Sequence, residues 1–162
     1  TTAGSFQMYF DGSDVSLSAK AEAIDALTIG PGGKLIISTK GKVTIKPPSG
    51  DLKAKNSDLL AFTFGTTGSS TSGTWSLYFE GADVGLKKEN VDALWIDPLN
   101  GDIYLSVINA YNLGNGVSGG AGTIFVCDPG SLGATTTCVY RNYWDAAAAG
   151  LNENIGGLFI QR

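Results

Sequence analysis

Short runs of alternating hydrophobic and polar residues, separated by turn-forming residues, recur along the 162-residue chain. Such runs, rich in β-branched and aromatic residues, predict strands, and the segment Gly30-Pro31-Gly32-Gly33 between two of them predicts a turn. No segment reaches the length of a stable helix, so the pattern predicts an all-β protein. The expected strands are residues 6–10, 24–29, 35–39, 59–64, 75–79, 91–96, 103–107, 123–127, 138–144 and 155–160.

The same letters occur twice along the chain. YFDGSDVSL at 9–17 matches YFEGADVGL at 78–86, and IDALTI at 24–29 matches VDALWI at 91–96. A third start follows, where YWD at 143–145 echoes YFE. Matches at nearly constant spacing indicate a duplicated unit of 65 to 69 residues. We therefore expect two four-stranded antiparallel repeats, 1–74 and 75–137, with a partial third repeat at 138–162, all in one structural domain.

Composition narrows the class of protein further. Hydrophobic residues make up 43% of the chain, which is enough for a core, and the net charge is −4. An acidic chain does not favour nucleic acid, which needs clustered Lys and Arg. No uninterrupted apolar run is long enough to span a membrane. The lysines at 34, 40, 42, 46, 53 and 55 are interpreted as solvated residues on an edge strand, where they discourage unwanted strand pairing.

The two cysteines, Cys127 and Cys138, flank turn-forming residues 128–133 and so fall on neighbouring strands of one hairpin. With Phe62 aligned to Phe125, the repeat places them where the first unit has Phe64 and Trp75, as expected for neighbouring cross-strand positions. We predict a disulfide between them. A disulfide implies an oxidising compartment, so the expected location is extracellular or at the cell surface.

Catalytic patterns are missing from the letters. The chain has no histidine, which removes the commonest general base and the Ser-His-Asp triad. No phosphate-binding glycine motif occurs. Asp25 and Asp92 hold equivalent positions in the two repeats, which favours the same structural task performed twice over a glycosidase pair. We expect a protein that is not an enzyme.

Calcium is the one cofactor that the letters suggest. Asp11 and Asp14 lie in one turn, and Glu80 and Asp83 repeat the arrangement. Calcium prefers six to eight oxygen ligands, of which these turns supply about half. The alternative is an Asx turn, in which the carboxylate accepts a hydrogen bond from its own turn.

The segment VDALWIDPLNGDIYLS at 91–106, together with YFDGSDV at 9–15, resembles blade-like repeats of secreted bacterial and archaeal β-propeller-type surface proteins. The resemblance covers about 150 residues. It implies four-stranded antiparallel blades and a cell-exterior setting, and it brings no catalytic residues.

A closed propeller usually has at least four blades, whereas this chain carries two and the start of a third. Unpaired strand edges are templates for another chain. We therefore expect a structural subunit that self-assembles into a filament, sheath or ring. Two alternatives stay open: a compact sandwich of the two units, and a secreted module that binds a polysaccharide or another ligand. The expected assembly strands carry Phe6, Met8, Phe10, Ile155, Leu158 and Ile160.

Overall fold

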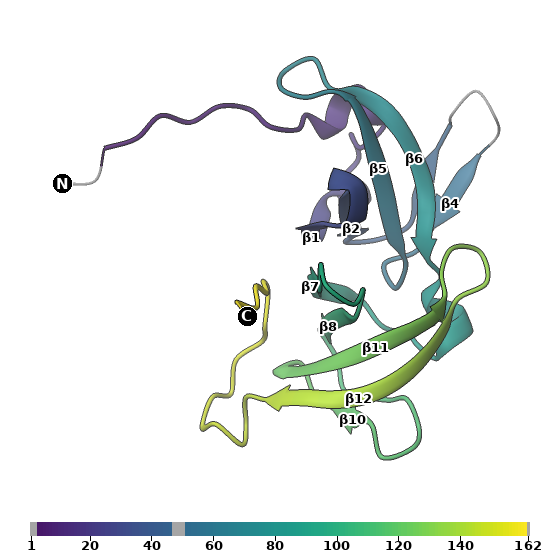
Figure 1. Cartoon of the computed structure of the whole chain (residues 1–162), viewed down its shortest axis with the longest axis vertical. Coiled ribbons are helices and arrows are strands. Elements are labelled where there is room, and N and C mark those ends of the chain that lie inside the picture. The colour runs from purple at the N-terminus through teal and green to yellow at the C-terminus, as the bar shows by residue number, and fades with distance from the viewer. Residues whose placement is uncertain (1–2, 47–50, 162) are drawn as a thin grey trace.

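The computed structural model describes residues 3–46 and 51–161 and is all-β, as predicted (Figure 1). Four single-turn 3-10 helices are present in these residues: η1 (Gly12–Val15), η2 (Lys20–Glu22), η3 (Pro31–Gly33) and η4 (Gly81–Val84). No helix among the described residues is long and apolar enough to cross a membrane. The strands are β1 (Ile24–Ile29), β2 (Leu35–Thr39), β3 (Val43–Ile45), β4 (Leu52–Ala54), β5 (Leu59–Thr66), β6 (Ser72–Phe79), β7 (Val91–Ile96), β8 (Ile103–Val107), β9 (Tyr111–Asn112), β10 (Ser118–Gly119), β11 (Thr123–Ser131) and β12 (Thr137–Asp145).

Eight of these strands form two four-stranded antiparallel sheets, and neither sheet closes on itself. The first, called blade 1, has the order β1-β2-β5-β6, and the second, blade 2, has the order β7-β8-β11-β12. The first strands of the two blades, β1 and β7, pack against each other where the blades meet (Figure 1). The repeat boundaries drawn from the sequence, after residues 74 and 137, lie inside β6 and β12, because the repeated letters begin on the last strand of a blade.

Three hydrophobic clusters alternate with the two blades. The inter-blade core lies between them and includes Ile36, Leu59, Leu94 and Phe125. On the other face of blade 1, the outer core is covered by η1 and by the hairpin β3–β4. On the other face of blade 2, a third cluster of Trp95, Tyr104, Ile124 and Val126 is covered by Ile155, Leu158 and Ile160.

Equivalent residues of the two blades belong to successive cores. Leu35 lies in the outer core, and its equivalent Ile103 lies in the inter-blade core. The next residue shows the same shift, because Ile36 lies in the inter-blade core and Tyr104 in the third cluster. Successive side chains of a strand point to opposite faces, so this shift means that the blades stack in the same orientation.

Two of the predicted strands are absent. Residues 6–9 and 155–160 carry no strand, and Phe10 makes only an isolated bridge to Gly68. By the repeat, residues 6–10 correspond to the end of β6 and residues 155–160 to β7. A strand needs a continuous ladder of hydrogen bonds to a neighbour, whereas these segments make only isolated backbone contacts, from the Gly68 amide to the Tyr9 carbonyl and from the Ile155 amide to the Ala121 carbonyl. The two short hairpins, β3–β4 and β9–β10, lie in regions that the sequence pattern left largely as loops.

Candidate functional site

The first repeated contact is a threonine that ties a hairpin of one blade to the chain that precedes that blade. Thr71 Oγ1 accepts a hydrogen bond from the Asp11 amide (2.8 Å), donates one to the Gly68 carbonyl (2.7 Å), and the Thr71 amide donates to Asp14 Oδ2 (2.9 Å). We call this arrangement the threonine clamp. It recurs at blade 2 with Thr136 in the same position, bound to Glu80, Asp83 and Gly133. The clamp therefore joins the end of one blade's last strand to the following blade.

The four carboxylates considered for calcium belong to the turns of these clamps. Asp11 Oδ1 accepts hydrogen bonds from the amide and the hydroxyl of Ser13, and these bonds lower the pKa of Asp11. Burial, together with the nearby Asp58, raises the pKa of Glu80. In the residues that the structure describes, no group of three or more His, Cys, Asp or Glu side chains could hold a metal ion. Calcium binding at these turns therefore stays a prediction, and their observed task is structural.

A second repeated contact links the first strands of neighbouring blades. Asn90 Nδ2 donates to Asp25 Oδ2 at 2.7 Å, and Asn154 Nδ2 donates to Asp92 Oδ2 at 2.6 Å. Burial raises the pKa of Asp92, whose Oδ1 is buried with no hydrogen-bond partner among the described residues. Each aspartate thus accepts from the unit that follows it. The two aspartates hold equivalent positions in the two blades, and the charge of Asp25 adds to the rise in the pKa of Asp92.

Cys127 and Cys138 form the predicted disulfide between β11 and β12, with a Cα–Cα distance of 5.2 Å. The alignment behind that prediction was wrong by two residues. Phe62 faces Trp75 in blade 1 and Cys127 faces Tyr140 in blade 2, so Cys127 replaces Phe62.

The same register places Cys138 where blade 1 has Gly73. A Cβ added at Gly73 would lie 2.2 Å from the Thr63 carbonyl oxygen and 2.5 Å from the Phe62 ring, so blade 1 has room for the ring only with glycine at this diagonal position. Residues 128–131, expected in the turn, instead extend β11, and Pro129 lies next to a register shift. A bulge is one of the few places where a strand tolerates proline.

The third start of the repeat forms a third copy of the same turn. The amides of Leu17, Leu86 and Leu151 each donate to a carbonyl five residues earlier at 2.8 Å. Likewise, Asp145 Oδ1 accepts from the Ala147 amide as Asp11 does from Ser13. The chain after β12 then docks on blade 2 as β7 docks on blade 1. The Ile155 amide donates to the Ala121 carbonyl, as the Val91 amide donates to Asn56.

Residues at the same position of the repeat are buried where two units of the chain meet. They are exposed on the two outer faces, where no further unit covers them. At the first face, Leu27 and Ile29 of β1 are 56% and 50% exposed, although their equivalents in β7, Leu94 and Ile96, are 1% and 3% exposed. We call the outer side of blade 1, with Leu27, Ile29 and the hairpin β3–β4, the head face.

The opposite side of the molecule repeats this contrast. Trp144 and Leu151 are 37% and 53% exposed, whereas their equivalents Phe79 and Leu86 are fully buried. Phe159 is also exposed although its equivalent Trp95 is buried, but it lines a groove together with Leu27 and Ile29 of the head face. We call the outer side of blade 2, with Trp144 and Leu151, the tail face. Of the repeat-equivalent aromatic residues Phe10, Phe79 and Trp144, the first two pack in the outer and inter-blade cores, and Trp144 lies at this face.

Only some of the six residues expected to form assembly contacts are exposed; the others pack within the chain. Phe6 and Met8 are exposed on an extended arm that leads away from blade 1 (Figure 1). Phe10 packs edge-to-face on Phe62, with ring centroids 5.3 Å apart. Residues 155, 158 and 160 pack on the third cluster.

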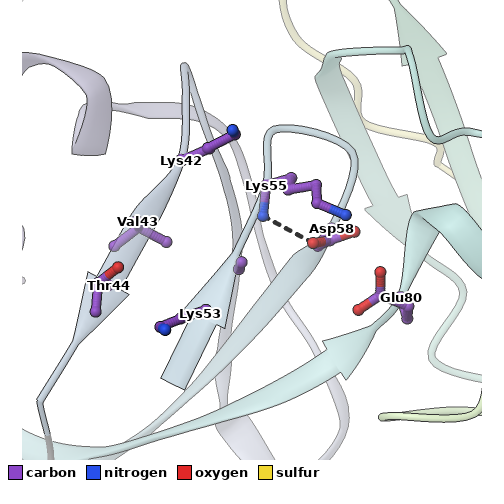
Figure 2. A pocket seen from close by; sticks show the side chains of 8 residues that line it. Lys42, Val43, Thr44, Lys53, Lys55, Asp58 and Glu80 are labelled. Atoms are coloured by element: carbon purple, nitrogen blue, oxygen red, sulfur yellow. Dashed lines mark hydrogen bonds between the residues drawn. The ribbon is translucent and has the colours of Figure 1, made fainter. Parts of the chain in front are cut away.

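Two grooves are lined by residues of blade 1 together with residues that follow it in the chain. An apolar groove of about 670 Å³ opens between β1, the end of β7 and residues 158–161. A second groove, of about 340 Å³, lies along β3–β4 and is lined by Lys42, Lys53 and Lys55, with Asp58 and Glu80 at one side (Figure 2). The carboxylate of Asp58 is already hydrogen-bonded there, because its two oxygens accept hydrogen bonds from the backbone amides of Lys55 and Gly81.

Comparison with protein-family models, with curated proteins and with solved structures finds no match for this chain.

Proposed function

We propose that the protein is a non-catalytic, extracellular structural subunit that self-assembles through its head and tail faces. The observation that supports the proposal is the contrast between equivalent residues. Leu94 and Ile96 are buried where two blades of one chain meet, and Leu27 and Ile29 have the same positions but remain open. A second copy is the partner that already carries a matching surface.

The exposed apolar side chains provide the driving force. Burying one leucine or isoleucine side chain contributes about 1.5–3 kcal/mol. Soluble monomers rarely expose large contiguous apolar patches, and such patches mark interaction sites. The disulfide fits an oxidising compartment. Head and tail are different surfaces, so their contact is heterologous and generates either a ring or an open filament.

The polar contacts between blades do not continue at the two faces. At the position of Asn90, the unit of β1 has Ala23, and at the position of Asp92, the tail has Gly156. The turn after β12 has Ala148 where the clamps have Asp14 and Asp83. The proposed contact between copies is therefore largely apolar and does not reproduce the hydrogen bonds of the internal joint.

A charged pair of substitutions on the head face tests the proposal. Leu27→Lys combined with Ile29→Lys leaves the internal cores untouched and should reduce the assembled mass to that of a monomer. Leu132→Lys, on the hairpin between β11 and β12, is the matched control, because Leu132 is also partly exposed but lines neither the groove with Leu27 and Ile29 nor the groove with Leu151. Light scattering after gel filtration, with electron microscopy of the native protein, gives the readout.

The apolar groove of about 670 Å³ supports one alternative, a module that binds a ligand. Its lining by Leu27, Ile29, Trp95 and Phe159 suits an apolar ligand better than a glycan, because Trp95 is buried and presents little of its ring. A polysaccharide or apolar ligand that binds a stable monomer, and loses affinity in the Phe159→Ala variant, would favour this alternative.

A further inference from the structure

The hairpin β3–β4 is amphipathic, with one face packed and the other charged. Val43 pairs with Ala54, and Thr44 pairs with Lys53. Because side chains alternate across a strand, Val43 and Ala54, which pack in the outer core, alternate with Lys42, Lys53 and Lys55, and these lysines line the groove along the hairpin (Figure 2).

Charge is strongly segregated at this hairpin. Residues 34–55 contain six lysines and one aspartate, which leaves five cations and fourteen carboxylates in the rest of the chain. The only ion pair between side chains of the described residues joins Arg141 to Asp102. Lys55 lies near enough to Glu80 to lower its pKa, whereas Lys42 and Lys53 have no ion-pair partner among these residues. An acidic protein therefore presents one cationic strip.

The second repeat shows that packing does not require these lysines. The corresponding hairpin, β9–β10, buries Tyr111 and Val117 in the inter-blade core. Its residues, from 108 to 122, include no lysine or arginine. Both hairpins have the same two-stranded form, so protection of free strand edges does not explain a strip found on only one of them.

The tail face carries the opposite charge. Asp145 and Glu153 line one groove of about 330 Å³, and no basic side chain of the described residues lines it. Leu151, one of the exposed apolar residues of the tail face, lines the same groove. From 89 to 161 the chain has seven carboxylates and a single cation, Arg141.

We propose that the lysine strip of one copy docks beside the acidic groove of a second copy and so fixes a head-to-tail polarity. This inference rests on the proposed function, since it names the surfaces through which the subunits meet. Lys42 and Lys53 lie on the hairpin β3–β4, which covers the outer core of blade 1. Complementary charge steers encounter and disfavours head-to-head contacts, in which like charges would meet. Salt screens such charges over roughly 8–10 Å, so sodium chloride should weaken the assembly.

Charge reversal tests the docking directly. Lys42→Glu with Lys53→Glu should raise the dissociation constant between subunits at least tenfold at low salt. Glu153→Lys with Asp145→Lys should do the same. A chain that carries all four substitutions should regain the wild-type constant, since each face then meets its complement. Asp145 also caps a turn, so Glu153→Lys alone is the second tail variant. Lys87→Glu with Lys88→Glu changes the net charge equally and serves as the control.

Analytical ultracentrifugation at 20 mM and 500 mM sodium chloride separates the outcomes. Assembly that is weakened by salt and by the hairpin pair, and restored by the quadruple variant, supports the docking. Wild-type assembly that neither salt nor Lys42→Glu with Lys53→Glu alters would overturn it and leave self-assembly standing. So would a hairpin that captures an acidic polysaccharide without changing the assembled mass. A wild-type monomer at both salt concentrations would overturn the proposed function itself.

Discussion

The side-chain amide of Asn90, at the entrance to blade 2, donates a 2.7 Å hydrogen bond to Asp25 in the first strand of blade 1. The same contact recurs as Asn154 to Asp92 at 2.6 Å. Together with the threonine clamps, it specifies how each unit sits on the one before it, since apolar packing alone sets no unique register. The same set of polar contacts therefore joins successive units at two places in the chain. The head and tail faces lack these contacts.

The Asn154→Ala substitution should loosen residues 154–160 without unfolding the blades. One hydrogen bond contributes about 1 kcal/mol, and this segment has no strand pairing to support it. Hydrogen exchange of the Ile155 amide should become several-fold faster, while the amides of β8 keep their protection. Asn152→Ala, an exposed neighbour, is the control. Equal acceleration in both variants would show that the Asn154 contact does not hold the segment.

Replacing Thr136 with valine should destabilise the fold by about 2 kcal/mol, because the shape is kept while the Glu80 amide and the Gly133 carbonyl lose their partner. Chemical denaturation measures the change. Thr135→Val, at an exposed neighbouring position, should alter the free energy of unfolding by less than about 0.5 kcal/mol. Equal effects of the two substitutions would contradict the structural role given to the clamp.

Reduction of the disulfide should lower the free energy of unfolding by about 2–3 kcal/mol, since Cys127 and Cys138 close only a short loop. Denaturation with and without a reductant measures the difference. A variant with alanine at both positions should show no further response to the reductant. A wild-type protein that is indifferent to reduction would mean that the bond does not constrain the unfolded chain.

The buried Asp92 predicts a pH dependence with a definite sign. Burial raises its pKa in the folded protein, so the ionised form costs stability once the pH exceeds the unfolded value of about 3.9. Asp92→Asn removes that cost and keeps an acceptor for Asn154. Relative to wild type, the variant should therefore gain stability as the pH rises from about 3.5 to 7. The free energies of unfolding of both proteins at the two pH values check this, and a constant difference would refute it.

Much of the fold could be predicted from the sequence, because the letters repeat and the strands alternate. The four main strands of each blade and the disulfide were found this way. Residues 6–10 were predicted as a strand and are not, because alternation reports a side-chain pattern and not the presence of a neighbouring strand. The cysteine hairpin was aligned two residues out of place because Phe62 and Phe125 are both phenylalanine. The strand register, which the turn of the hairpin fixes, instead makes Cys127 the equivalent of Phe62.

The joint itself could not be read from the sequence. Thr71 and Thr136 lie in segments that look like ordinary turns. Only the fold shows which backbone amides donate hydrogen bonds to their hydroxyl groups. The spacing of 65 residues between these threonines was the one available signal. The lysine strip was seen as a run of letters, but its orientation depends on the register of β3 and β4, which the pattern left as a loop.

The mass of the native, non-reduced protein in solution tests the central claim most directly. Light scattering at micromolar concentration, on wild type and on the Leu27→Lys, Ile29→Lys double variant, compares open and blocked head faces. The proposed function predicts rings or filaments for the wild type and a 16.8 kDa monomer for the variant. A wild-type protein that is monomeric at every concentration would contradict self-assembly, and the apolar groove would then be the place to search for a ligand.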